Sequence, residues 1–138
     1  MKRTQSLGWL AASCALAMAA PVAAHHSFAA AYDTSAEGAI TITGTIVNVR
    51  LTNPHSFFFL DVEGDDGEVV RWSFEAGTPS GMIRNGYSPK VIKEGDVVTI
   101  SGFRARDGSQ PNGMLRELKT ADGTVYGMFG PVEGPGAR

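Results

Sequence analysis

The sequence has little of the residue types that most often carry chemistry in small proteins. It contains one cysteine and three histidines, and its 12 basic residues are outnumbered by 14 acidic ones. Because the basic residues are scattered in an acidic chain, nothing in the sequence suggests electrostatic binding to nucleic acid or to an anionic membrane. The serines stand outside any nucleophile-elbow pattern, and the glycines form no phosphate-binding loop. Composition therefore gives no sign of a common hydrolytic or phosphate-binding site.

The chain also lacks an apolar run long enough to cross a membrane. A mostly apolar stretch from Leu7 to Ala20 follows Lys2 and Arg3, and it is shorter than the ~20 residues that a spanning helix needs. This pattern predicts a signal peptide over residues 1–24, with a permanent anchor as the alternative. We expect a bacterial protein of the periplasm or the medium, with no membrane insertion after signal cleavage.

Cleavage after Ala24 would leave a mature chain of 114 residues that begins with His25. Its only cysteine, Cys14, would be lost, so the mature chain would have neither a disulfide nor a thiolate ligand. An apolar core alone must then stabilise it, which is feasible at this length. We predict three parts, an extended N-terminal arm (25–38), a barrel domain (39–129) and a disordered tail (130–138).

Alternation of apolar and polar residues predicts an all-β fold with one short helical connection. Gly44 predicts a bulge or bend in the long first strand, and residues 64–67 have the composition of a hairpin turn. This order of elements is typical of a small OB-like Greek-key β-barrel of five to six strands, with an open β-sandwich as the alternative. Strands are expected at 39–51, 55–62, 68–75, 96–104, 114–120 and 124–129, and helical turns at 79–85 and from Ser88.

The three histidines fall in two places, at His25-His26 and at His55. A histidine at a mature N-terminus offers its α-amine and its imidazole Nδ1, and a second imidazole completes a T-shaped set of three nitrogens, a histidine brace. Planar nitrogen sets of this kind suit copper. We therefore predict a copper site made by His25 and His55, with His26 as an auxiliary ligand. Asn53 and Ser56 are candidates for hydrogen bonds to the ligands.

The sequence leaves two alternatives to this site open. If Ala24 stayed on the chain, the terminal amine, two backbone nitrogens and His26 would hold copper or nickel in a square plane. If no metal binds, His25 and His26 form a polar terminus and His55 caps a strand. The protein would then be a periplasmic interaction module for a peptide, a glycan or a protein partner. With no extended substrate surface in the sequence, we expect binding rather than catalysis.

A set of short motifs is spread along the chain. They are His25-His26-Ser27-Phe28, Gly44-Thr45-Ile46, Thr52-Asn53-Pro54-His55, Trp72, Gly86-Tyr87-Ser88 and Lys93-Glu94-Gly95-Asp96 with Val98. Together they resemble a family of small exported bacterial proteins that is known only as a domain of unknown function. The likeness extends from about His25 to Phe129. It implies an OB-type barrel and export, and it implies no activity.

Overall fold

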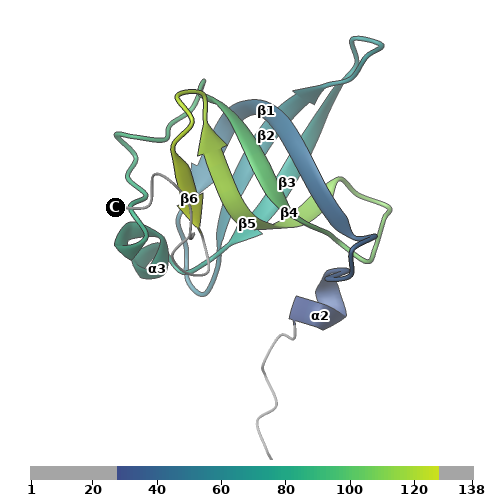
Figure 1. Ribbon diagram of the computed structural model, residues 1–138, viewed down its shortest axis with the longest axis horizontal. Helices are drawn as coiled ribbons and strands as arrows, with labels where there is room; N and C mark the ends of the chain where they lie inside the picture. Colours follow the sequence, from purple (N-terminus) through teal and green to yellow (C-terminus); the bar gives the residue numbers. More distant parts are fainter. Residues whose placement is uncertain (1–27, 128–138) are drawn as a thin grey trace, which may run out of the picture.

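Six strands and two short helices make up residues 28–127, the part of the chain that the computed structural model describes (Figure 1). The elements are α2 (Phe28–Ala31), β1 (Ala39–Arg50), β2 (Ser56–Glu63), β3 (Val69–Ala76), α3 (Pro79–Arg84), β4 (Val97–Arg104), β5 (Asn112–Thr120) and β6 (Val125–Gly127). Antiparallel neighbours follow the order β3-β2-β1-β4-β5-β6, and a parallel pairing of β3 with β5 closes the ring. Closure excludes the open sandwich and confirms the predicted OB-like Greek-key barrel.

Strand β1 holds the barrel together because its two halves have different neighbours. Its first half, from Ala39 to Thr45, pairs with β4, and the half from Thr45 onward pairs with β2. The exchange occurs beside Gly44, where a Cβ would lie 2.7 Å from the carbonyl oxygen of Asp61. The register then shifts between residues 46 and 48. The predicted irregularity is therefore present just beyond Gly44, and it allows one strand to serve both halves of the barrel.

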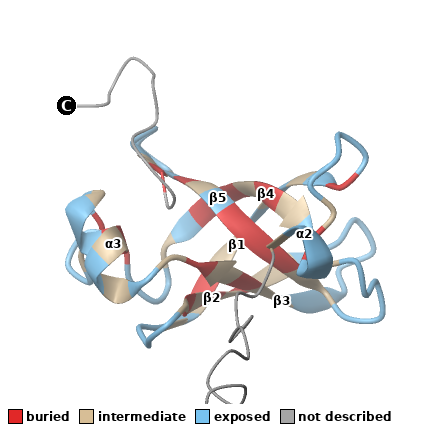
Figure 2. Cartoon of the chain, turned by 90° about the horizontal axis from the view of Figure 1, so that it is seen from below, coloured by how far each residue is buried: buried red, intermediate tan, exposed pale blue. Residues whose placement is uncertain are grey.

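The core fills the inside of the barrel with alternate residues of each strand (Figure 2). Helix α3 closes one side by burying Met82 completely. Its first turn is capped by Thr78, whose Oγ1 accepts a hydrogen bond from the Gly81 N–H at 3.1 Å. The fully buried large side chains of the strands are Ile46, Phe58, Leu60, Phe74, Val98, Ile100, Leu115 and Leu118.

The second predicted helical turn forms, but as a single turn that does not continue into a helix. The Ile92 N–H donates to the Ser88 carbonyl, four residues earlier, at 2.9 Å. The Ser88 Oγ accepts from the Lys90 N–H at 3.2 Å, as the predicted N-cap would. The chain then reaches Gly95, with a φ of +88°, and enters β4 before a helix can extend.

The N-terminal arm differs from the extended segment that the sequence predicts. Its first described residues form α2, and Tyr32 then makes an isolated bridge with Ala105. Arg106 fastens this helix by donating from Nε to the Ala29 carbonyl at 2.8 Å and from its backbone N–H to the Ala31 carbonyl at 2.9 Å. Figures 1 and 2 place α2 and α3 on opposite sides of the barrel.

The predicted signal peptide and C-terminal tail lie outside the described residues, as do His25 and His26. In the described range, neither helix has the length and apolar character needed to span a bilayer.

Candidate functional site

His55 lies directly before β2, beside the end of β3. Its imidazole Nδ1 pairs with Oε1 of Glu75, and the two side chains are 26% and 17% exposed. The antiparallel register of β2 with β3 creates this contact, because it pairs Ser56 with Ala76 and Phe57 with Glu75. A carboxylate that accepts from Nδ1 leaves Nε2 as the ring nitrogen available to a ligand.

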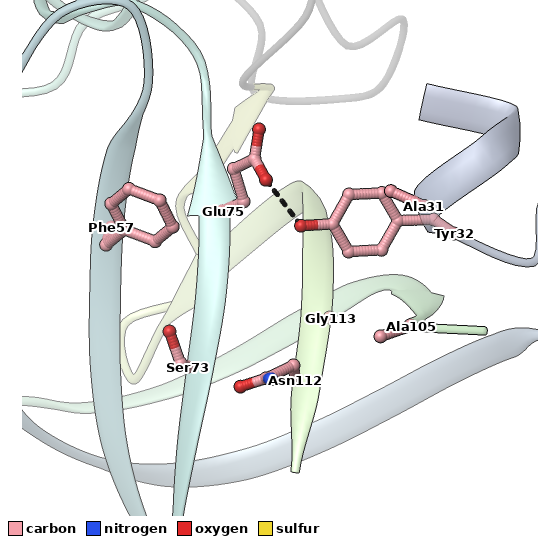
Figure 3. A pocket seen from close by; sticks show the side chains of 8 residues that line it. All are labelled: Ala31, Tyr32, Phe57, Ser73, Glu75, Ala105, Asn112 and Gly113. Carbon is pink, nitrogen blue, oxygen red and sulfur yellow. Dashed lines mark hydrogen bonds between the residues drawn. The ribbon is translucent and has the colours of Figure 1, made fainter. Parts of the chain in front are cut away.

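The same carboxylate joins the histidine to the N-terminal arm. Oε2 of Glu75 accepts a hydrogen bond of 2.5 Å from the Tyr32 hydroxyl, which Figure 3 shows as a dashed line. Burial first, then this hydrogen bond and the negative charge of Glu75, raise the pKa of the Tyr32 phenol well above its usual range. The phenol therefore keeps its proton and remains a donor. Both oxygens of Glu75 are engaged, which fixes the orientation of the His55 ring.

Phe28, the first described residue, rests against the same histidine. The ring centroids of Phe28 and His55 are 5.5 Å apart, and those of Phe28 and Tyr32 are 6.3 Å apart. Farther along the arm, the Asp33 N–H donates to the Arg104 carbonyl at 2.9 Å. The arm is thus held on the barrel at several points, and the described chain begins at the His55 ring.

The structure describes three of the five residues assigned to the predicted metal site, His55, Asn53 and Ser56. Asn53 is exposed in the loop before His55, and its peptide bond to Pro54 is cis. Ser56 is completely buried, and its Oγ has no hydrogen-bond partner within residues 28–127. In that range the side chain bonded to His55 is Glu75, while Asn53 and Ser56 make no hydrogen bond to it.

Sequence reasoning missed Glu75 and the hydrogen bond that Tyr32 donates to it. The sequence carries no usable signal for Glu75, because pairing continued from a turn at residues 64–67 would place Phe57 opposite Phe74, whereas the structure pairs Phe57 with Glu75. It carries none for the contact of Tyr32 either, since that contact depends on how the arm folds back over the barrel.

The described part of the chain does not hold a complete metal site by itself. Between residues 28 and 127, no group of three or more histidine, cysteine or acidic side chains is placed to hold a metal ion. The described residues contribute one imidazole, with a carboxylate on its Nδ1. Any further nitrogen ligands would have to come from His25 and His26.

Comparison with known proteins adds a family without a known activity. A search of curated proteins gives no match. A family of unknown function, DUF6152, matches residues 13–114, which include the three histidines together with Tyr32 and Glu75. This confirms the family resemblance drawn from the motifs. Since the match covers well over half of the chain, the protein belongs to the DUF6152 family.

Proposed function

We propose that this protein binds a copper ion through His25, at the mature N-terminus, and His55, with His26 as an auxiliary ligand. The observation that carries the proposal is the pairing of His55 Nδ1 with the Glu75 carboxylate. Metal-ligating histidines almost always donate their second ring N–H to a carboxylate, a carbonyl or water, which fixes the tautomer and makes the ligating nitrogen more basic. His55 has this arrangement, and its ring is partly exposed.

The length of chain between the two predicted ligands is compatible with a shared ion. Two residues lie between His25 and Phe28, and three steps along an extended chain span at most about 3.6 Å each, so their Cα atoms lie no more than ~11 Å apart. The Phe28 ring already contacts the His55 ring at 5.5 Å between centroids. His25 therefore has sufficient reach to share an ion with His55 while the described arm stays in place.

The donor types favour copper over other divalent ions. The set contains the α-amine and imidazole of His25 and the Nε2 of His55, and it contains no thiolate because Cys14 is removed with the signal peptide. Three nitrogens in a T-shape suit Cu(II), which also stands highest in the divalent affinity order. The role that follows is copper binding, buffering or delivery in the periplasm.

The test begins with the exported protein made with its own signal sequence. Intact mass establishes the first residue, and Cu(II) is then titrated against a competing chelator. We expect one tightly bound copper, and an affinity at least about tenfold lower in His55→Ala. A variant with one glycine added before His25 should instead bind Cu(II) independently of His55, because the terminal amine, two backbone nitrogens and His26 would then form the square-planar set.

Thr52→Ala is the matched control, since it alters the same exposed loop without removing an imidazole. Circular dichroism would verify that each variant is folded. A mature chain that begins well away from His25 would overturn the proposal. So would a His55→Ala variant that binds copper as tightly as the unchanged protein.

A further inference from the structure

A pocket of about 210 Å³ lies on the outer face of the barrel, between the N-terminal arm and strands β2, β3 and β5 (Figure 3). Tyr32 and Glu75 form one wall, and Phe57 forms another. The small residues Ala31 and Ala105 leave the space between the arm and the strands open. Pockets for whole drug-sized ligands measure about 300–1,000 Å³, so this one accommodates a small ligand or one unit of a longer one.

The charge of the pocket argues against an anionic ligand. Glu75 is the only charged side chain in its lining among the described residues. Both oxygens of Glu75 are already engaged, one by the Tyr32 hydroxyl and the other by His55 Nδ1. A phosphate or carboxylate would meet a negative charge without a counter-charge, and a cation would have to compete with two donors already in place. The lining is therefore best matched by a neutral polar ligand.

Two polar side chains of the pocket have hydrogen-bonding capacity that the described protein does not use. Ser73 on β3 and Asn112 at the start of β5 are paired in the parallel ladder that closes the barrel. Both are partly buried, and within the described range neither side chain makes a hydrogen bond. Figure 3 shows them below the Tyr32–Glu75 pair. A hydroxyl beside a carboxamide offers both donors and acceptors at one place, which suits neighbouring hydroxyl groups.

An aromatic surface continues from the pocket along β2. Phe57 and Phe59 are both partly exposed on the outer face, with ring centroids 6.5 Å apart and an interplanar angle of 29°. Phe59 lies opposite Ser73 in the register of β2 with β3, so the two rings border the row that contains Ser73 and Glu75. The guanidinium of Arg50 covers the Phe59 ring at 5.5 Å from its centroid. The apolar surface thus extends beyond the pocket itself.

We propose that this pocket binds one ring of a neutral oligosaccharide. The apolar face of the sugar ring packs on Phe57, and its hydroxyl groups bond to Ser73 and Asn112. The next sugar unit extends toward Phe59, where the Arg50 guanidinium that covers the ring can donate to its hydroxyl groups. The outer face of strands β2 and β3 is also where OB-folds bind oligosaccharides. The proposal does not require copper, because the groups that would hold the sugar are Phe57, Ser73 and Asn112, while the Glu75 carboxylate in the pocket wall is the group that pairs with His55.

The exported, processed protein is titrated in the presence of a chelator with three probes, which are the hexamers of β-1,4-glucose, α-1,4-glucose and β-1,4-N-acetylglucosamine. We expect at least one to cause saturable NMR shifts at the amides of Ser73 and Asn112. Phe57→Ala should weaken that binding about tenfold, and Asn112→Ala about two- to tenfold. Phe103→Ala and Asn48→Ala are the matched controls, since both residues lie outside this pocket, and they should leave the affinity unchanged.

Three outcomes would overturn the proposal. One is the absence of saturable binding by all three saccharides at millimolar concentration. Another is saccharide binding that Phe57→Ala leaves unchanged. The last is binding of a lysine-rich or neutral peptide at these residues while no saccharide binds there. Because no metal is present, none of these results bears on the copper proposal, which the chelator competition tests separately.

Discussion

Tyr32 and Glu75 are 43 positions apart in the sequence, and a hydrogen bond of 2.5 Å joins them. This bond fastens the N-terminal arm to β3 and occupies the carboxylate oxygen that does not contact His55. It thus links the position of the arm to the orientation of the predicted metal ligand. The effect of Tyr32 on the attachment of the arm and the effect of Glu75 on metal binding can be tested separately.

Tyr32→Phe removes the hydroxyl and leaves a partly buried carboxylate oxygen without its donor. A hydrogen bond to a charged group contributes about 1.5–3 kcal/mol, so we expect the free energy of unfolding to fall by about 1–2 kcal/mol at this partly exposed site. Urea denaturation measures the change. Hydrogen exchange at the Asp33 and Arg106 amides, which donate to Arg104 and Ala31, should become faster as the arm loosens.

Tyr126→Phe is the control, since Tyr126 is also partly buried and donates no hydrogen bond within residues 28–127. A loss of stability in Tyr126→Phe equal to that in Tyr32→Phe would show that the Tyr32–Glu75 bond has no special effect.

Gly102 lies at the bulge where β4 meets β5. A Cβ at this position would be 1.8 Å from the carbonyl oxygen of Met114, a backbone atom that can move only if the strand moves. We therefore expect Gly102→Ala to lower the free energy of unfolding by about 2–3 kcal/mol or more. Gly108→Ala is the matched control because nothing lies within 4 Å of its added Cβ. Equal stability of the two variants in thermal unfolding would contradict the register of β4 with β5.

The barrel could be predicted from the sequence because its determinants are local. Period-2 alternation of β-branched and aromatic residues gave strand limits within two residues of those observed for β1 to β5. Glycine and hairpin-type residues marked the interruptions, as at residues 64–67 and near Gly44. The order of strands around a central helical connection then restricted the topology to an OB-like barrel.

The arm and its contacts could not be predicted in the same way. Helix α2 has four residues, too few to form a stable helix by themselves. It exists because Arg106, 77 positions away, bonds to the carbonyl of Ala29. The pairing of His55 with Glu75 likewise depends on barrel register, which residue composition does not encode. The histidines stood out as candidate ligands because the sequence contains only three of them. The contact of the Glu75 carboxylate with His55 is visible only in the folded structure.

Ser56 is a completely buried hydroxyl without a hydrogen-bond partner in the described part of the chain. A buried hydroxyl without a hydrogen-bond partner lowers the stability of the folded protein. Ser56→Ala removes this hydroxyl with little change in side-chain volume. We expect Ser56→Ala to raise the free energy of unfolding by up to ~1 kcal/mol. The control is Ser101→Ala, whose hydroxyl pairs with Thr41 at 3.3 Å near the surface, and it should stay within about 0.5 kcal/mol of the unchanged protein. Marked destabilisation by Ser56→Ala would indicate a bound partner, such as an internal water.

Asp96 stabilises the turn that leads into β4, and this effect should depend on pH. The hydrogen bond from the Lys93 side chain, followed by that from the Lys93 backbone N–H, lowers the pKa of the Asp96 carboxyl below its usual value. A lowered pKa in the folded state adds stability above the pKa of the unfolded chain, and this stability is lost as the pH falls through the folded value.

We therefore expect Asp96→Asn to lower the Tm most near pH 7 and progressively less below about pH 4. Thermal unfolding between pH 2.5 and 7 measures the difference. Asp65→Asn, in the turn between β2 and β3, is the control for loss of a turn carboxylate. A Tm difference that stays constant across the pH range would show that the charge of Asp96 is not what stabilises the turn.

Glu75→Gln tests whether the carboxylate on His55 supports metal binding rather than folding alone. A glutamine keeps the size of the side chain but removes the charge, and it can present an amide N–H to the imidazole instead of accepting from it. Loss of such a carboxylate typically costs 10–100-fold in metal affinity, so we expect Cu(II) affinity to fall about tenfold or more. Asp61→Asn is the matched control, because Asp61 is a carboxylate on the neighbouring strand β2 that pairs with Arg71 at 2.7 Å and has no contact with His55 in the described residues. Equal copper affinities for Glu75→Gln and Asp61→Asn, with both proteins folded, would mean that the bond between His55 and Glu75 only stabilises the fold.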